Sequence, residues 1–431
     1  MSPAAKITLL FVVFVDLIGQ GLVFPIINTL IMEPAAGFLP EQASTARRHF
    51  DYGLVIGSFF LAWFFGVVYV AKLSDSIGRR NAMLICLAGA LAGYVITIVA
   101  LQTGSLWLLI LGRVVTGFTA GNQPIAQAAM IDGSTDDADR DRNMGYIVTG
   151  VSFGLVGGPI IGGILSDRSL IGTAASLALP FYAALGLVVV AILLVLVFFK
   201  DIRQERESFA FRPGDVFASL WKVTGFPLVM RIMPVYSFFM IANVTFYVFI
   251  DNYLTSAYGY GVIGSSAIML VIGVALATSS TFLVKPAQQR FDKSRIVQAS
   301  LLAMAVCAVT VVLAPTALSC FVAAFFFYFL FGVSYPTILG LFSGSVGDRE
   351  QGWIMGVATA VFCLAGGIMS LIGGELMRID IRLPFFIVIA AAVLGLAALR
   401  LTWNRDDVRR LIGRPTAGAS TPGTEQPSVK T

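Results

Sequence analysis

Residues 71–80 read Ala71-Lys72-Leu73-Ser74-Asp75-Ser76-Ile77-Gly78-Arg79-Arg80 and separate two long apolar stretches, 53–70 and 81–101. These ten residues carry four charges, in a chain where only 12% of the residues are charged. A turn this short between two apolar helices must lie at a membrane surface, and its three basic residues place it on the cytoplasmic side. Gly78 suits a turn that needs positive φ. Asp75 can accept hydrogen bonds from N–H groups at a helix start, or from an arginine.

The composition extends this interpretation to the whole chain. Hydrophobic residues make up 57% of its 431 residues, and the mean hydropathy is +0.86. A soluble domain of this size has no use for so much apolar side chain, because its surface must be polar. We therefore expect a membrane protein that crosses the bilayer many times. The net charge of +5 comes from basic residues scattered through loops, which does not indicate nucleic-acid binding.

The sequence gives little reason to expect a metal site or disulfide bonds. The four cysteines stand singly in or beside apolar runs, and His49 is the only histidine. A zinc site and a disulfide framework are therefore not expected, and neither is any cofactor. The first apolar run has no small-residue cleavage site, so it predicts a retained membrane helix rather than a signal peptide.

Twelve apolar segments have about the ~20 residues that a helix needs to cross a bilayer. They cover 6–32, 53–71, 80–101, 105–131, 143–165, 174–199, 227–253, 261–284, 296–315, 317–346, 353–375 and 383–403. With the N-terminus inside, cytoplasmic segments hold 22 Lys and Arg residues and external loops hold five. This bias places both termini in the cytoplasm.

The two halves of the chain resemble each other weakly. Gln123-Pro124 corresponds to Tyr335-Pro336, 212 residues later. Residues 73–80 are weakly similar to residues 286–293, which lack equivalents of Asp75 and Gly78. The pattern predicts an all-α membrane protein with twelve transmembrane helices in two pseudo-symmetric six-helix bundles. The bundles are residues 1–199 and 227–403.

Residues 200–226 form a predicted cytoplasmic linker between the bundles. Within it, Asp215 could cap a short amphipathic helix that lies on the inner membrane surface and carries Val216, Phe217, Leu220 and Trp221. Residues 404–431 form a cytoplasmic tail rich in Gly, Pro, Ser and Thr, which we expect to be disordered.

Two ionisable residues lie deep within apolar segments. Asp16 is ~15 Å from the cytoplasmic start of the first helix, and Arg113 is ~12 Å from the external start of the fourth. Charge inside a membrane is expensive, so both are candidates for function. Their proximity would allow Asp16 to change protonation as access alternates, which a proton-coupled transporter requires. The alternative is a static pair that fixes helix packing.

Small and polar residues mark the fourth and fifth segments. Gln127 shares the helical face of Arg113, with Gln123 beside it. The fifth segment contains Gly154-Leu155-Val156-Gly157-Gly158-Pro159-Ile160-Ile161-Gly162-Gly163. Small residues at four-residue spacing let helices approach closely, and Gly-Pro permits a bend. The alternative is a close-packed helix with no special role.

These stretches resemble the major facilitator superfamily. Leu73, Asp75, Gly78, Arg79 and Arg80 match its loop between helices 2 and 3, G-x-L-a-D-r-x-G-r-r, with Ala71 in place of the usual glycine. The resemblance implies that Asp75, Gly78, Arg79 and Arg80 form a gate that latches the outward-open state. The fifth segment resembles g-x-x-x-G-P-x-x-G-G, which in that family marks proton-driven exporters more than importers.

The first and fourth segments resemble the drug–proton antiporter branch, which includes tetracycline and multidrug exporters. Asp16, Gly19, Gly21, Leu22 and Pro25 match its pattern D-x-x-G-x-G-l-x-x-P. Arg113 resembles an arginine that the family assigns to proton transfer. Residues 128–133 resemble a-y-i-a-D-i of that branch, and Asp132 is expected either to bond to the 2–3 loop or to be a solvated helix end. The second half has no histidine, unlike some tetracycline exporters, which argues against tetracycline as the substrate.

By family analogy, the substrate cavity lies between helices 1, 4, 7 and 10. We expect it to be lined by amides and aromatic rings that suit an amphiphilic ligand, although any one aromatic could instead face lipid or the core. The candidates are Gln20, Gln123, Gln127, Tyr236, Asn243, Tyr247, Phe331 and Tyr335, with Tyr328 and Asp251 on the same helical faces. Asp251 lies near an external helix end and could be an ordinary solvated residue.

The sequence therefore predicts a secondary transporter, not an enzyme, in the cytoplasmic (inner) membrane. We expect it to export a small organic compound in exchange for protons by alternating access, as a monomer powered by the proton gradient. A proton symporter that imports a nutrient or siderophore is the main alternative. A channel would not need the Asp16 and Arg113 arrangement, and no G-x-x-x-x-G-K-[ST] loop for ATP is present.

Overall fold

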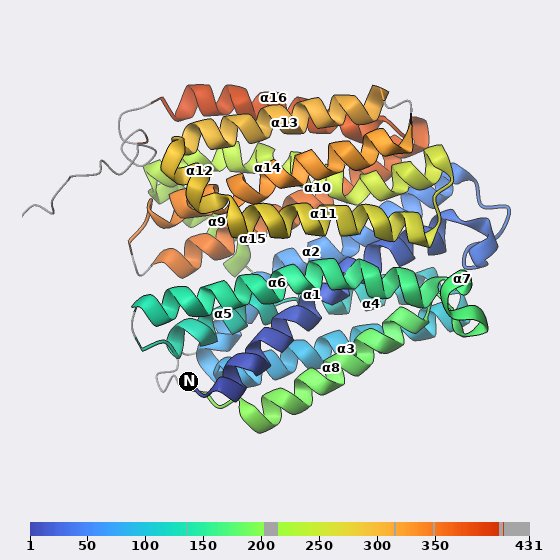
Figure 1. The fold of residues 1–431 in the computed structure, drawn as a ribbon, viewed down its shortest axis with the longest axis horizontal. Coiled ribbons are helices and arrows are strands. Elements are labelled where there is room, and N and C mark those ends of the chain that lie inside the picture. Colours follow the sequence, from blue (N-terminus) through green and yellow to red (C-terminus); the bar gives the residue numbers. More distant parts are fainter. Residues whose placement is uncertain (136, 202–213, 314–315, 348–349, 405–407, 409–431) are drawn as a thin grey trace, which may run out of the picture.

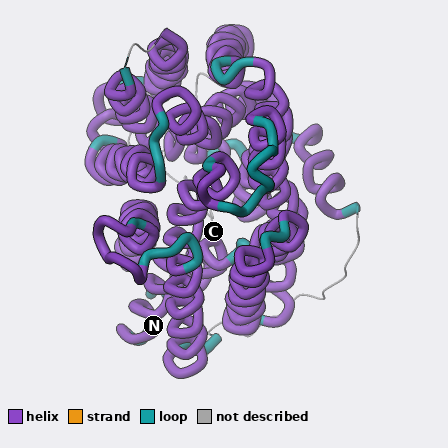
Figure 2. Tube along the Cα trace, turned by 90° about the vertical axis from the view of Figure 1, so that its right-hand side faces the viewer, coloured by secondary structure: helices purple, strands orange, loops and turns teal. Residues whose placement is uncertain are grey.

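The structure is a computed structural model, and it describes residues 1–431 except 136, 202–213, 314–315, 348–349, 405–407 and 409–431. Over the described residues, all regular secondary structure is helical, which confirms the predicted all-α fold. Figure 2 looks along the helices and shows them joined by short loops. Most of the predicted tail, 404–431, lies outside the described residues, as do 202–213 of the linker.

The long helices divide between the two halves of the chain, which lie one above the other in Figure 1. The N-terminal half contains α1 (Pro3–Met32), α2 (Thr45–Ile77), α3 (Arg79–Thr103), α4 (Leu106–Phe118), α5 (Asn122–Asp132), α6 (Asp137–Ser166) and α8 (Leu179–Phe198). The C-terminal half contains α10 (Pro227–Tyr258), α11 (Val262–Phe282), α13 (Lys293–Leu313), α14 (Ala317–Ser343), α15 (Gln351–Ile379) and α16 (Leu383–Thr402). Short helices α7 (Arg168–Ile171), α9 (Asp215–Trp221) and α12 (Val284–Arg290) connect them, with 3-10 turns at Pro34–Ala36, Gly172–Ala174 and Lys222–Gly225.

The fourth predicted segment is broken. Eleven helices among the described residues are long and apolar enough to cross a membrane, and α4 with α5 takes the place of the single helix expected over 105–131. That expectation of one continuous helix was wrong. Pro124 has no N–H and would clash in a helix interior, whereas it is tolerated in the first turn of α5. At the break, the N–H groups of Ala120 and Gly121 donate to Gly117 and Thr119 in tight turns.

The glycines of the 154–163 stretch bring α6 against α1. A Cβ atom on Gly158 would lie 2.8 Å from the Ile18 carbonyl oxygen, and one on Gly162 would lie 3.3 Å from the Leu22 Cα. The ring of Pro159 lies against Gly21 of α1. Gly163 faces Ser266 of α11, so the same helix also contacts the other half. The predicted close helix packing is therefore present, and α1 is the helix that it positions.

The interface between the halves is built on α2 and α15, which run side by side (Figure 1). A Cβ atom on Gly374 would lie 2.8 Å from the His49 carbonyl oxygen, so the two backbones touch. Further contacts between the halves lie toward the predicted external ends. The Tyr52 hydroxyl donates to the Val248 carbonyl oxygen at 2.8 Å, and the Phe24 and Tyr247 rings meet edge to face. The halves are therefore closed together on the predicted external side.

The opposite ends of the halves are joined differently. Helix α5 packs on α1, α2, α3 and α6 of its own half, and the linker helix α9 contacts both α2 and α15. Lys72 of α2 pairs with Asp215 at 2.7 Å, and the Trp353 indole N–H of α15 donates to the Ser219 carbonyl oxygen. Asp215 makes this ion pair as the first residue of α9, and the N-cap position that was predicted for it belongs to Gly214. Phe217 and Trp221 are exposed, as expected for a helix on a membrane surface.

Replacing Gly158 tests whether the α1–α6 contact needs glycine. Gly158→Ala places a methyl group against the α1 backbone, and overpacking of this kind costs about 1–3 kcal/mol. We expect the apparent Tm of the purified protein in detergent to fall by several degrees. Gly186→Ala in α8 is the control, because a Cβ atom there meets nothing within 4 Å. Equal Tm values for the two variants would contradict the packing described here.

Candidate transport site

The break in the fourth segment gives α5 a free N-terminus inside the helix bundle, and Asp16 of α1 faces it. The Asp16 carboxyl group interacts with the side-chain amide of Asn122 and the backbone N–H of Gln123, the first two residues of α5. The N-terminus of a helix carries partial positive charge and unpaired N–H groups, so it stabilises an anion. Asp16 is partly exposed to solvent, although it lies midway along α1. It can therefore hold either a negative charge or a proton.

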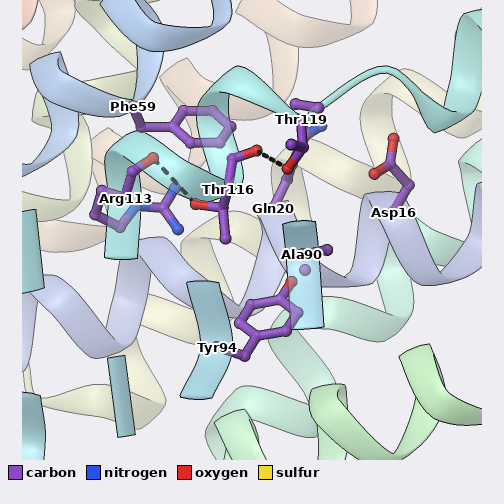
Figure 3. Close-up of a pocket in the computed structure, with 10 residues that line it drawn as sticks. Asp16, Gln20, Phe59, Ala90, Tyr94, Arg113, Thr116 and Thr119 are labelled. Atoms are coloured by element: carbon purple, nitrogen blue, oxygen red, sulfur yellow. Dashed lines mark hydrogen bonds between the residues drawn. The ribbon is translucent and has the colours of Figure 1, made fainter. Parts of the chain in front are cut away.

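Arg113 lies on the far side of a small cavity from Asp16, with Thr116 and Thr119 between them in Figure 3. Its side chain is buried, and its guanidinium carbon lies 4.3 Å from the centre of the Phe59 ring. No ion pair joins Asp16 and Arg113 among the described residues, and the Arg113 Nε atom has no hydrogen-bond partner there. The expected direct pairing is therefore not present. The two groups share a cavity instead.

Tyr94 of α3 lines the same cavity as the two groups, and its hydroxyl lies against Gly19. The cavity of about 30 Å³ has room for one or two water molecules. It is lined by Asp16, Gly19, Gln20, Phe59, Ala90, Tyr94, Arg113, Thr116, Thr119 and Ala120. Sequence reasoning missed Tyr94 and Asn122. A buried asparagine directly after the Gly117/Gly121 pair was the available signal for the second.

The 2–3 loop is held by ion pairs to its own half. Arg79 pairs with Asp75 at 2.8 Å and with Asp132 at 3.0 Å, and it also donates to the Ser74 hydroxyl. Asp132 ends α5, so the 2–3 loop is tied directly to the half-helix whose other end faces Asp16. Of the two expectations for Asp132, a bond to the 2–3 loop or a solvated helix end, the structure has the first. Asp75 likewise has the arginine partner that the sequence allowed.

Gly78 adopts the backbone conformation predicted for it, with φ of 95°. It ends α2 and directly precedes α3, and the Asp201 side chain packs against its Cα. Asp201 accepts a hydrogen bond from the Arg80 N–H at 2.8 Å and so caps α3, while the Arg80 guanidinium donates to the Leu196 carbonyl oxygen. Asp201 was missed because its position, about 120 residues further along, carries no local motif.

Aromatic rings of α10 and α14 form a continuous wall in the second half. Phe331 stacks between Phe239 and Tyr335, at 5.1 and 5.4 Å between ring centres. Tyr328 contacts both Phe331 and Tyr247. Tyr247 and Tyr335 are only partly buried, so part of this aromatic surface is exposed to solvent.

The remaining substrate candidates have different environments. Asn243 is buried and its side-chain oxygen has no partner among the described residues, which leaves it able to accept a hydrogen bond. Tyr236 is fully buried, and its hydroxyl donates to the Ala358 carbonyl oxygen of α15, so in this conformation it holds the C-terminal half together. Gln20, Gln123 and Gln127 are half-buried on α1 and α5. The substrate roles of all these residues remain predictions.

Known proteins resemble the chain over nearly its whole length. Residues 9–370 match the family model of the Major Facilitator Superfamily. The class C tetracycline resistance protein of Escherichia coli is 29% identical over 84% of this chain and 87% of its own length. The quinolone resistance protein NorA of Staphylococcus aureus is 24% identical over 90% of this chain and 93% of its own length.

Solved structures agree with the fold. The human organic anion transporter MFSD10 superimposes with a TM-score of 0.70 at 17% identity, over 93% of this chain and all of its own. A D-xylose–proton symporter gives 0.72 at 13% identity, over 94% of this chain and 98% of its own. At such identities the likeness shows the fold alone. From the family model and the relatives together, the chain belongs to the Major Facilitator Superfamily and is a multi-pass membrane transporter, not an enzyme.

Proposed function

We propose that this transporter exports a small amphiphilic organic compound in exchange for protons, with both termini in the cytoplasm and a single chain as the working unit. The observation that carries the proposal is the partly exposed Asp16 held at the N-terminus of the broken fourth helix, beside a water-sized cavity. Relatives named for tetracycline and quinolone resistance support export of organic compounds. These two drug classes differ chemically, so we propose an amphiphilic substrate rather than either drug.

Asp16 is the proposed proton carrier. As a carboxylate it is stabilised by the N–H groups of α5, and as an acid it places no charge among the helices. Arg113 contributes a positive charge to the same cavity, where no carboxylate among the described residues neutralises it by an ion pair. Its field favours release of the proton whenever the cavity opens toward a compartment of low proton concentration. Water in the cavity supplies the path between the groups.

The proposed substrate site lies between the polar face of the first half and the aromatic wall of the second. Gln20, Gln123 and Gln127 offer amides on one side, and Asn243 offers its unpaired oxygen on the other. Tyr247, Phe331 and Tyr335 offer flat apolar surface to a planar ligand. Few polar groups among many aromatic rings give weak discrimination between similar shapes, which suits a transporter of several related compounds.

Proton movement across liposomes tests the direction of coupling. Purified protein is reconstituted with a pH-sensitive dye inside, and a tetracycline, a fluoroquinolone and ethidium are added in turn. We expect at least one compound to move protons opposite to itself, and Asp16→Asn to abolish that movement. Gln102→Ala, at an exposed position near the end of α3, is the control and should couple normally. Movement of protons in the same direction as the compound would make the protein a symporter.

If the ion pair between Arg79 and Asp132 matters for transport, the effects of replacing these two residues on the turnover rate should not be independent. Arg79→Gln and Asp132→Asn should each lower turnover several-fold, because each frees α5 from the 2–3 loop. The double variant should be no slower than the slower single variant, since the two residues act through one contact. Arg168→Gln is the control, because Arg168 is an exposed arginine of α7 in the same half, outside the 2–3 loop. If the fold-loss of turnover in the double variant equals the product of the two single fold-losses, the two residues act independently.

A further inference from the structure

A buried carboxyl group other than Asp16 lies between the halves at their predicted external ends. Asp251 of α10 is fully buried, which corrects the expectation that it could be an ordinary solvated residue. It belongs to the C-terminal half, and Asn28 of α1, from the N-terminal half, is one of its polar neighbours. Asn28 is also fully buried and donates to the Thr255 hydroxyl of α10 at 2.7 Å. The carboxyl group is therefore enclosed only while the halves are together.

The groups that face Asp251 are neutral or weakly acidic. Ser265 of α11 and Asn28 are its polar neighbours, and Tyr52 of α2 and Tyr247 of α10 are its titratable ones. His49 of α2 interacts with Asn252. On the nearby α15, Arg378 pairs with Glu375. Among the described residues, no cation pairs with Asp251, in contrast to Asp51, a buried acid of α2 that pairs with Arg47 at 2.9 Å.

Three oxygen atoms of this cluster accept no hydrogen bond from the described residues. Both oxygen atoms of Asp251 and the side-chain oxygen of Asn28 are buried with no hydrogen-bond partner among the described residues. These are all acceptors, and buried acceptors without donors cost free energy. A carboxylate here would also be a buried charge without a counter-ion, which is more expensive still. A proton on Asp251 removes the buried charge, and the acid O–H supplies a donor that the Asn28 oxygen can accept.

We propose that Asp251 is a second proton-binding site, at which a proton taken from the external side holds the two halves closed there. When the halves separate, Asp251 loses Asn28 and gains water, and it releases its proton. Deprotonated Asp251 then opposes closure until a new proton binds. This proton acts on the gate and returns to the side from which it came, so it is distinct from the proton carried by Asp16. The proposal builds on the alternating access assumed under the proposed function.

Distances between spin labels on the two halves test the proposal without a substrate. Thr103, at the end of α3, and Thr316, directly before α14, are exposed and belong to different halves. Each is replaced by cysteine and labelled with a nitroxide. The four native cysteines are buried, so the introduced residues react first. Because the readout is a distance, it remains informative if proton-driven export itself proves wrong.

As the pH rises from about 5 to about 9, we expect the native protein to shift from short to long distances, since deprotonation opposes closure. Asp251→Asn, which resembles the protonated acid, should keep the short distance throughout. Asp251→Glu should retain the shift with a changed midpoint, which guards against a folding defect in the first variant. Asp16→Asn should shift like the native protein.

Two matched variants exclude other titrating groups. Asp51→Asn removes a buried acid that already has a cationic partner, and His49→Gln removes the only histidine. Both should shift with the native midpoint. The proposal is overturned if the native distances do not depend on pH, if Asp251→Asn keeps the native midpoint and amplitude, or if His49→Gln abolishes the shift.

Discussion

The arrangement of the first half depends on a free helix N-terminus inside the membrane. Backbone N–H groups have no water to bind within a bilayer, so a helix that breaks there needs another partner. In this protein the start of α5 meets the carboxyl group of Asp16 on α1. The contact explains why a charge is tolerated midway along an otherwise apolar helix. Under the proposed function, gain or loss of a proton on Asp16 changes how α1 and α5 hold each other.

The same half-helix links the proposed proton site to the proposed gate. Asp16 faces one end of α5, and Arg79 of the 2–3 loop binds Asp132 at the other. Glycines 154–163 hold α1 on α6, which in turn contacts α11 of the second half. A change at Asp16 can therefore reach both the loop and the interface through packed, rigid elements. The predicted external side is closed by α2 against α15 and by the contacts of Asn28 and Tyr52.

Local patterns in the sequence were enough to predict the all-helical fold, the positive φ of Gly78 and the close approach around Gly158, because each depends on nearby residue types. The break at 119–121 had a local signal as well, Pro124, which was not used. Two features were not predictable in this way. The distance between Arg113 and Asp16 depends on side-chain directions across helices, and the burial of Asp251 depends on Asn28, 223 positions earlier. Contacts between helices decide each of these, and helical periodicity alone does not encode them.

Proton release on ligand binding tests the central claim most directly, because it reports on Asp16 without a membrane gradient. The purified protein is held in detergent in weakly buffered solution with a pH indicator, and a compound that it transports is added. The account predicts release of about one proton per chain as substrate enters the site. It also predicts that Asp16→Asn binds the compound but releases none. Undiminished release from Asp16→Asn would contradict the account and move the proton site elsewhere.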